Sequence, residues 1–134
     1  MITKEDLIKA AFEAEKNAYA PYSNYHVGAA IGTKDGRIFL GANIENASFG
    51  ATNCAERSAV FSAYSNGCRK DDIIGLAIVS DGDRIAAPCG ICRQVLSELL
   101  NQDTPIYLTN GKDAVDTNIA ALLPMQFGIE DVIR

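Results

Sequence analysis

Three cysteines and one glutamate are the residues of this sequence best suited to chemistry. Cys89 and Cys92 lie three positions apart, so their thiols can coordinate one soft cation from a single turn of the chain. Cys54 can supply a third ligand from a distant segment. Zinc takes tetrahedral coordination, so three protein ligands leave the fourth corner free for water. The spacing therefore predicts a zinc site with one open position.

A carboxylate beside these cysteines favours a catalytic site over a structural one. Glu56 follows Cys54 by two residues. Zinc lowers the pKa of a bound water from about 15.7 towards about 7. A neighbouring glutamate that is not itself a ligand can then carry the released proton to a substrate nitrogen. This combination predicts hydrolysis at an amidine-like carbon.

The sequence resembles the cytidine deaminases of the small, all-cysteine type. The signature of zinc deaminases is His or Cys, any residue, then Glu, followed later by Pro-Cys-x-x-Cys. Cys54-Ala55-Glu56 and Pro88-Cys89-Gly90-Ile91-Cys92 match it, and the resemblance runs from about residue 19 to residue 127. The further matching segments are Ala20-Pro21-Tyr22-Ser23-Asn24-Tyr25, Val27-Gly28-Ala29-Ala30, Gly41-Ala42-Asn43-Ile44-Glu45-Asn46 and Leu122-Leu123-Pro124. Their order and spacing together make the resemblance highly specific.

The resemblance implies one Zn²⁺ per subunit and a reaction of pyrimidine salvage. Cytidine and 2′-deoxycytidine would be hydrolysed to uridine and 2′-deoxyuridine with release of ammonia. Water activated by zinc would attack C4, while Glu56 first protonates N3 and then passes a proton to the leaving amino group. Because three thiolates leave the metal with a net negative charge, Arg57 is expected to compensate that charge and to hydrogen-bond to the sulfurs.

The resemblance also implies the groups that bind the nucleoside. Asn43 and Glu45 would bind the ribose 3′-hydroxyl, and the backbone near Ala55 would orient the base. Tyr25 stands where an aromatic residue, usually Phe, lies against the ligand. Phe127 matches an aromatic residue that the family supplies across a subunit boundary, so a homotetramer is expected.

The first elements that must position these residues are a helix and a hairpin. Thr3 and Asp6 form a capping-box pattern, and apolar residues then recur at helical spacing until Pro21. Residues 27–31 and 37–42 are apolar or alternating runs joined by a turn that ends in Asp-Gly, which predicts two antiparallel strands.

Strands and helices alternate after the hairpin. A helix is predicted over residues 54–66 and ended by Gly67, then a buried strand over 73–80, a helix over 89–100, a strand over 105–109 and a short helical end. A sheet with helices on both faces buries such elements. We therefore expect an α/β fold, a three-layer α/β/α sandwich with a mixed central sheet.

Both ends of the metal motif are predicted to fall at helix starts. Helix N-termini carry partial positive charge and unpaired amides, which favours the thiolates of Cys54 and Cys89. Pro88 suits a first turn, and Asn53 or Thr52 is a candidate cap. The carbonyl of the residue before Cys89 is expected to help orient the base.

Composition sets the broad class. Residues 1–134 are expected to form one domain, with 48% hydrophobic and 22% charged residues. A net charge of −5 without a basic run argues against a nucleic-acid polymer as partner. No apolar run is long enough for a membrane helix and the N-terminus has no signal-peptide pattern, so a cytoplasmic location and no membrane partner are expected.

Simpler interpretations of the cysteines were weighed. Cys89 and Cys92 alone suit a redox pair, but that would leave the triplet at Cys54 unexplained. Cys68 could complete a structural zinc site, yet it lies 14 residues beyond Cys54. Across a helix this separation is roughly 20 Å. A non-enzymatic zinc-stabilised module is the second hypothesis, and the intact Glu56 counts against it.

Three residues near the motifs have no single predicted role. His26, the only histidine, is expected to be a surface or packing residue with no chemistry. Arg93 and Gln94 follow Cys92 directly, and hydrogen bonding to the site and exposure to solvent remain equal alternatives. Among substrates of related enzymes, the segment 43–46 fits cytidine better than blasticidin S.

Overall fold

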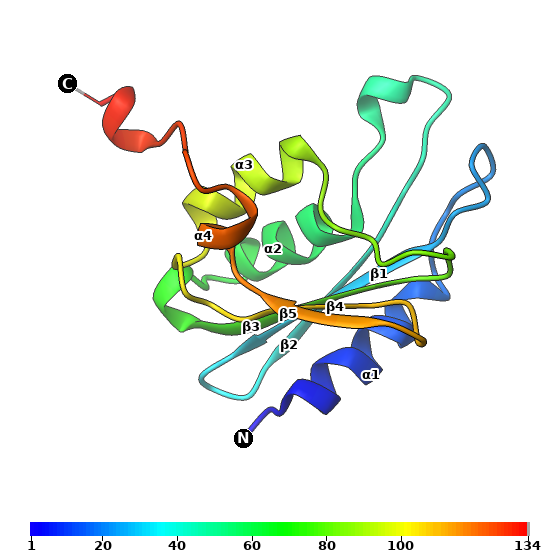
Figure 1. Cartoon of the computed structure of the whole chain (residues 1–134), viewed down its shortest axis with the longest axis horizontal. Coiled ribbons are helices and arrows are strands. Elements are labelled where there is room, and N and C mark those ends of the chain that lie inside the picture. Colours follow the sequence, from blue (N-terminus) through cyan, green and yellow to red (C-terminus); the bar gives the residue numbers. More distant parts are fainter. Residues whose placement is uncertain (134) are drawn as a thin grey trace.

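A mixed β-sheet organises residues 1–133, the part of the chain that the computed structural model describes (Figure 1). Its five strands lie in the order β2-β1-β3-β4-β5, with β3 and β4 parallel and the other neighbouring pairs antiparallel. In chain order the elements are α1 (Lys4–Glu15), β1 (Val27–Thr33), β2 (Ile38–Ala42), α2 (Ala55–Ser65), β3 (Ile73–Ser80), α3 (Gly90–Leu99), β4 (Ile106–Thr109), β5 (Ala114–Thr117) and α4 (Ile119–Leu122), with 3₁₀ turns at Phe49–Ala51, Lys70–Asp72 and Ile129–Asp131.

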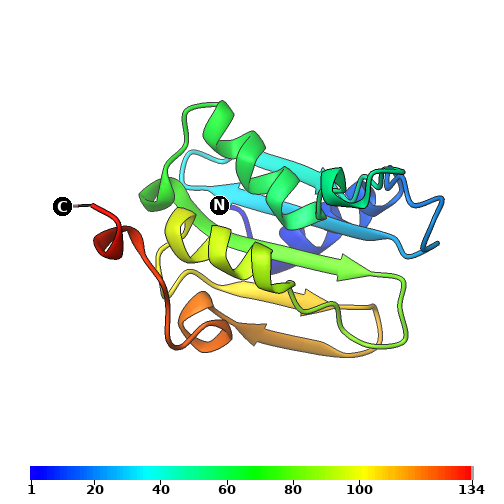
Figure 2. The same ribbon diagram turned by 90° about the horizontal axis from the view of Figure 1, so that it is seen from above.

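Helices cover both faces of this sheet (Figure 2). α1 packs on one face, where Leu7 and Ala11 join Ala30, Ala77 and Val79 in a small apolar cluster. α2 and α3 contact each other on the opposite face, over a larger apolar cluster that takes side chains from β1, β3 and β4. The predicted three-layer α/β/α sandwich with a mixed sheet is confirmed. Within residues 1–133, no helix is long and apolar enough to cross a membrane.

Local signals located most of the elements. The Thr3 hydroxyl accepts a hydrogen bond from the Asp6 amide at 3.1 Å, and the Asp6 carboxylate accepts one from the Thr3 amide at 2.9 Å, so the capping box is present. Gly67 follows α2 with a φ of +92°, a conformation that favours glycine. The sequence did not predict β5, because its residues are mostly exposed and this edge strand has no alternating apolar pattern.

The starts of α2 and α3 differ in detail from the prediction. Cys54 and Cys89 are themselves the N-cap residues, and neither makes a side-chain capping hydrogen bond. The prediction that Asn53 or Thr52 caps α2 was wrong, because both side chains hydrogen-bond elsewhere. Pro88 precedes the cap instead of lying in the first turn. Each cysteine therefore stands directly at the positive end of a helix.

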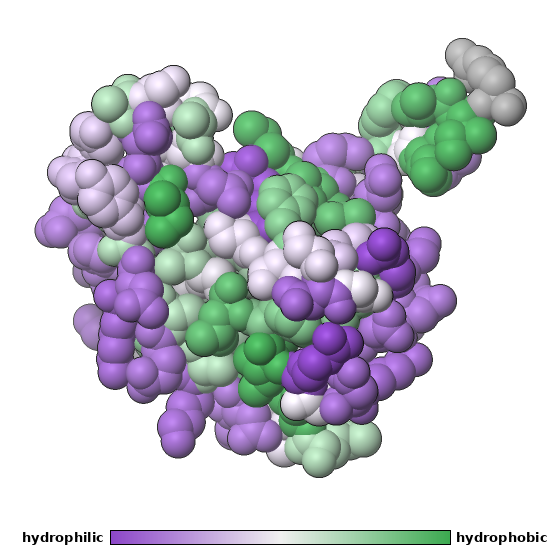
Figure 3. All heavy atoms as spheres, turned by 180° about the vertical axis from the view of Figure 1, so that it is seen from behind, coloured by the Kyte–Doolittle hydropathy of each residue, from purple (hydrophilic) through white to green (hydrophobic). Residues whose placement is uncertain are grey.

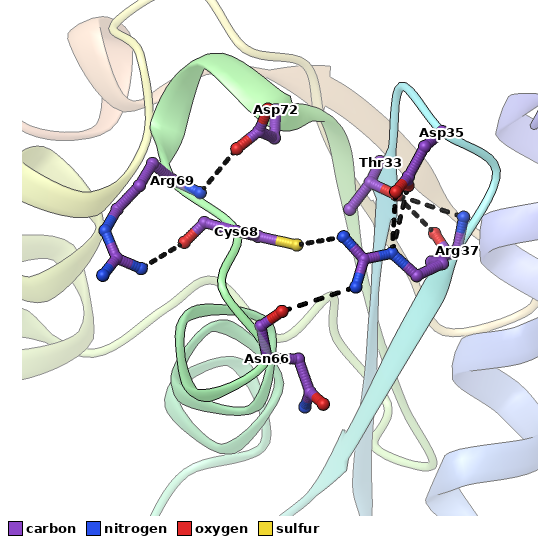
Figure 4. A network of polar contacts seen from close by, with 7 residues as sticks. All are labelled: Thr33, Asp35, Arg37, Asn66, Cys68, Arg69 and Asp72. Atoms are coloured by element: carbon purple, nitrogen blue, oxygen red, sulfur yellow. Dashed lines mark hydrogen bonds and ion pairs between the residues drawn. The ribbon is translucent and has the colours of Figure 1, made fainter.

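Cys68 has a structural environment (Figure 4). It is buried beyond the end of α2, where its sulfur accepts a hydrogen bond from Nη2 of Arg37 at 3.3 Å. Arg37 also pairs with the Asp35 carboxylate at 2.9 Å and donates to the Asn66 carbonyl at 3.4 Å. These contacts join the β1–β2 hairpin to the end of α2.

Candidate active site

The candidate site lies where β2 and β3 end and β1 begins. The register pairs Gly28 with Ala42 and Val27 with Ser80, so these three strand ends lie side by side. The segments that follow β2 and β3 lead into α2 and α3, whose N-cap cysteines line one cavity together with Val27. Sheet register therefore brings together residues that are far apart in the sequence.

Three thiols meet at this edge. The Sγ atoms of Cys54, Cys89 and Cys92 all lie within 4.8 Å of one another, and those of Cys54 and Cys89 are 3.9 Å apart. Zinc–sulfur bonds of about 2.3 Å in tetrahedral geometry place two sulfurs about 3.8 Å apart. The donor set and its spacing therefore fit one zinc ion. No other group of His, Cys, Asp or Glu within residues 1–133 meets the same criterion, so Cys68 is not a fourth ligand.

The charge beside the thiols is balanced by Arg57. Its Nη2 donates a hydrogen bond to Sγ of Cys54 at 3.4 Å. Hydrogen bonds from Cys92 and Arg57, opposed by burial, lower the pKa of the Cys54 thiol to about 5. The hydrogen bond to Cys54, together with burial, raises the pKa of the Cys92 thiol, and the hydrogen bond to Cys54 also raises the pKa of Arg57. Of Cys54 and Cys92, Cys54 is thus the thiol that ionises more readily.

Glu56 is a buried carboxyl group next to these sulfurs. Only 5% of the residue is exposed. Burial, together with the negative charge of Cys54, raises the pKa of Glu56 to about 7. A carboxyl group in such an environment exchanges a proton near neutral pH, which is the property that general acid and base chemistry needs.

A cavity of about 340 Å³ opens onto Cys54, Cys89 and this carboxyl group. The volume lies within the range of small-molecule sites. Its wall combines the predicted site residues with others, namely Ser23, Tyr25, Val27, Asn43, Glu45, Thr52, Asn53, Cys54, Ala55, Glu56, Ala86, Ala87 and Cys89. The structure therefore places Cys54, Cys89, Glu56 and four of the five predicted substrate contacts around one space, while Cys92 lies buried behind the wall.

Asn43 and Glu45 are already partly engaged by the protein. The Asn43 side chain accepts a hydrogen bond from the Val27 amide at 2.9 Å and donates one to the Tyr25 carbonyl at 2.8 Å. An amide group so engaged retains one N–H and one lone pair for a ligand. Glu45 accepts from the Ser23 hydroxyl and from the amides of Tyr22 at 2.9 Å and Ser23 at 3.1 Å.

These hydrogen bonds, the one from the Ser23 hydroxyl foremost, lower the pKa of Glu45. The carboxylate therefore stays ionised and can accept a further hydrogen bond from a sugar hydroxyl. Ser23, Ala86 and Ala87 are wall residues that sequence reasoning did not single out. The signals for Ser23 were its place in a matching segment and its hydroxyl two residues before Tyr25.

Phe127 is the predicted contact that stays away from the cavity of its own chain. Within the described residues it is 62% exposed and is not part of the cavity wall. Its carbonyl accepts a hydrogen bond from Gln94 at 2.8 Å, while Arg93 donates to the Pro88 and Leu122 carbonyls, each at 2.7 Å. Both residues after Cys92 therefore hold the C-terminal segment against α3, and the carbonyl before Cys89 is already bonded.

Three thiols and a buried glutamate at the starts of two helices, above a mixed sheet, define a zinc-dependent deaminase domain. Residues 1–108 match the family described as the zinc-binding region of cytidine and deoxycytidylate deaminases. The chain belongs to this family, whose members are zinc-dependent hydrolases. The predictions of the family, of the enzyme class and of zinc as cofactor are confirmed.

Relatives match over nearly the full chain. A cytidine deaminase of Halalkalibacterium halodurans is 50% identical over 130 residues, which cover 96% of this chain and 97% of the relative. A cytidine deaminase of Sporosarcina psychrophila is 47% identical over 129 residues, covering 96% and 93%. The crystal structure of cytidine deaminase from Burkholderia pseudomallei superimposes with a TM-score of 0.89 and 48% identity, covering 93% of this chain and 99% of that one.

Zinc content tests the assignment of ligands. Cys89→Ala removes one of the clustered thiols, so purified protein should hold far less than one zinc per chain when measured by mass spectrometry of the metal. Cys68→Ala removes a buried thiol outside the cluster and is the matched control, which should keep its zinc. Equal loss in both variants, or full zinc in Cys89→Ala, would contradict the assignment.

Arg57→Ala tests the balance of charge. The variant should keep its zinc, because all three thiols remain, but turnover should fall about tenfold or more, because a hydrogen bond to a charged sulfur is lost. Measurement of zinc content and of kcat on the same preparation separates the two effects. A variant with unchanged turnover would remove the argument for this residue.

Proposed function

We propose that this protein hydrolyses cytidine and 2′-deoxycytidine to uridine and 2′-deoxyuridine with release of ammonia. The observation that carries the proposal is the position of Glu56, buried beside three clustered thiols on the wall of a cavity of about 340 Å³. The two relatives at 50% and 47% identity, both cytidine deaminases, support the same reaction. A role in pyrimidine salvage, a cytoplasmic location and a single domain over residues 1–134 stay predictions.

Each residue of the motif has a defined part in this reaction. Cys54, Cys89 and Cys92 would hold the zinc ion, which would supply Lewis-acid activation of the water that attacks C4 of the pyrimidine. Glu56 takes the two protons of the attacking water in turn, passing the first to N3 and the second to the leaving amino group, so that cytidine and water become uridine and ammonia. Arg57 offsets part of the negative charge of the thiolates.

The rest of the cavity orients the nucleoside. We assign the ribose 3′-hydroxyl to Asn43 and Glu45, which keep free hydrogen-bonding capacity on the cavity wall. The backbone of Ala55, at the start of α2, faces the base, and Tyr25 closes the side of the cavity. A neutral nucleoside suits this site, because a phosphate would need a cation and no Lys or Arg lines the cavity within the described residues.

A homotetramer belongs to this proposal. The C-terminal segment is held to α3 as far as Phe127, and its end, with the 3₁₀ turn Ile129–Asp131, stands away from the body of the subunit and presents an apolar surface (Figure 3). Met125, Phe127 and Val132 of this segment are 92%, 62% and 63% exposed. Large exposed apolar patches are typical of protein interfaces. A neighbouring subunit that covers this segment would receive Phe127 beside its own cavity.

A second substrate class has one supporting observation. A blasticidin-S deaminase of Bacillus cereus is 35% identical over 134 residues, covering 94% of this chain. This identity is lower than the 50% and 47% of the cytidine deaminases of H. halodurans and S. psychrophila. Blasticidin S is therefore the second candidate substrate, after cytidine. A panel of cytidine, deoxycytidine, cytosine, deoxycytidylate and blasticidin S decides between the classes.

Deamination is measured by the loss of ultraviolet absorbance of cytidine. The zinc-replete protein should consume cytidine, and Glu56→Gln should lower kcat by about 10²-fold to 10⁴-fold, because the amide keeps the shape but cannot carry the proton. Zinc content should be the same in both. No loss of absorbance with the unaltered protein, or a rate indifferent to Glu56→Gln, would falsify the catalytic proposal and favour a non-enzymatic zinc module.

Mixing two defective subunits tests the role of Phe127. Phe127→Ala and Glu56→Gln should each have low activity alone. After the two proteins are unfolded together and refolded, mixed assemblies should gain activity, because an intact Glu56 can then meet Phe127 from its neighbour. Light scattering of the unaltered protein should give the mass of four chains. A monomer, or a mixture no more active than its parts, contradicts the shared site.

A further inference from the structure

His26 and Asp81 form a pair with three contacts across two neighbouring strand ends. His26 directly precedes β1, and Asp81 directly follows β3. The Asp81 carboxylate accepts from the His26 backbone amide at 2.9 Å and lies 2.6 Å from Nδ1 of the imidazole. The Asp81 amide donates to the His26 carbonyl at 3.2 Å. The sequence predicts a surface or packing residue at His26, and the structure adds a partner for its side chain that the sequence did not indicate.

The residues next to this pair touch each other. Tyr25 precedes His26, and Gly82 follows Asp81. A Cβ placed on Gly82 would lie 2.7 Å from Cε1 of Tyr25, which is closer than unbonded carbon atoms approach. The tyrosine ring thus occupies space that only glycine leaves open, and the pair fixes the spacing between the two segments.

Tyr25 is a wall between two cavities. It lines the cavity of about 340 Å³ that contains Glu56. It also lines a larger depression of about 630 Å³, formed with residues 83–87 and Asp113, which contains none of the thiols. A displaced ring would therefore change the shape of the catalytic cavity.

The backbone of Tyr25 is held from the cavity side as well. Its carbonyl accepts from the Asn43 side chain at 2.8 Å, and its amide donates to the Ser23 hydroxyl at 3.1 Å. These contacts fix the main chain but leave the ring free to turn about its side-chain torsions. The close contact of the ring with Gly82 restricts these torsions and so defines the position of the ring.

We propose that His26 and Asp81 are positioning residues that set the ring of Tyr25 and thereby the affinity of the site for nucleosides. This inference rests on the proposed function, since Tyr25 is one of its substrate contacts. It assigns a role to two residues outside the metal motif and outside the predicted contacts.

The charges around the pair favour a firm contact. Although burial opposes it, hydrogen bonds from His26 and the charge of its ring lower the pKa of Asp81, so the carboxylate is an ionised acceptor. Glu15, at the end of α1, faces the same group, and its pKa is raised by burial and by the charge of Asp81.

Two substitutions at one position test the pair. His26→Leu removes the donor, whereas His26→Asn keeps an N–H near the position of Nδ1. His26→Leu should raise KM for cytidine about threefold to tenfold while kcat stays within about twofold, and His26→Asn should restore KM. The same shift is expected in the Kd of cytidine measured by calorimetry in the Glu56→Gln background, where no turnover is needed.

A second comparison asks whether the pair acts through Tyr25. In a Tyr25→Ala background, His26→Leu should cause no further change in KM or Kd. Gly82→Ala should raise both with the pair intact, and it carries the test if His26→Leu does not fold. The inference is overturned if KM and Kd are unchanged in a folded His26→Leu, or in Gly82→Ala where His26→Leu does not fold, or if the effect persists in full without Tyr25. An unaltered protein that binds cytidine but does not deaminate it contradicts the proposed function instead.

Discussion

The convergence of two helix N-termini on one cluster of sulfurs is the constraint on which the structure depends. Cys54 and Cys89 are the N-caps of α2 and α3, and their sulfurs are 3.9 Å apart. The partial positive charge of both helix ends favours thiolates over thiols. The helices can meet in this way only because they lie side by side on one face of the sheet, after strands whose ends are in register.

The same region must satisfy opposing electrostatic demands. Clustered thiolates repel one another and any nearby carboxylate, yet Glu56 lies buried beside them. The positive charge of Arg57 offsets part of this repulsion, because its guanidinium donates a hydrogen bond to the sulfur of Cys54. The neighbouring negative charge and burial together raise the pKa of Glu56, which keeps a proton available where a carboxylate in water would have lost it. The same repulsion that disfavours a charged Glu56 thus keeps this residue able to give and take a proton near neutral pH.

Sequence reasoning succeeded where the signal was local. Capping and turn residues located α1, the hairpin and the end of α2, and the spacing of the cysteines located the three clustered thiols. It failed for β5, an exposed edge strand stabilised by pairing with β4 and not by a pattern of its own. The partner of His26 was also not predictable, because Asp81 lies 55 positions away and is brought near only by the pairing of β1 and β3.

The metal motif and the C-terminal segment share one turn of helix. Arg93 and Gln94 follow Cys92 in α3, and their side chains hold the carbonyls of Leu122 and Phe127. Arg93 also donates to the carbonyl of Pro88, so it fixes the turn that carries both Cys89 and Cys92. A shift of this turn would therefore move two sulfurs and the apolar segment together. The turn that carries two of the clustered sulfurs is thus hydrogen-bonded to the C-terminal segment, and Arg93 and Gln94 both bind backbone carbonyls although Gln94 is exposed.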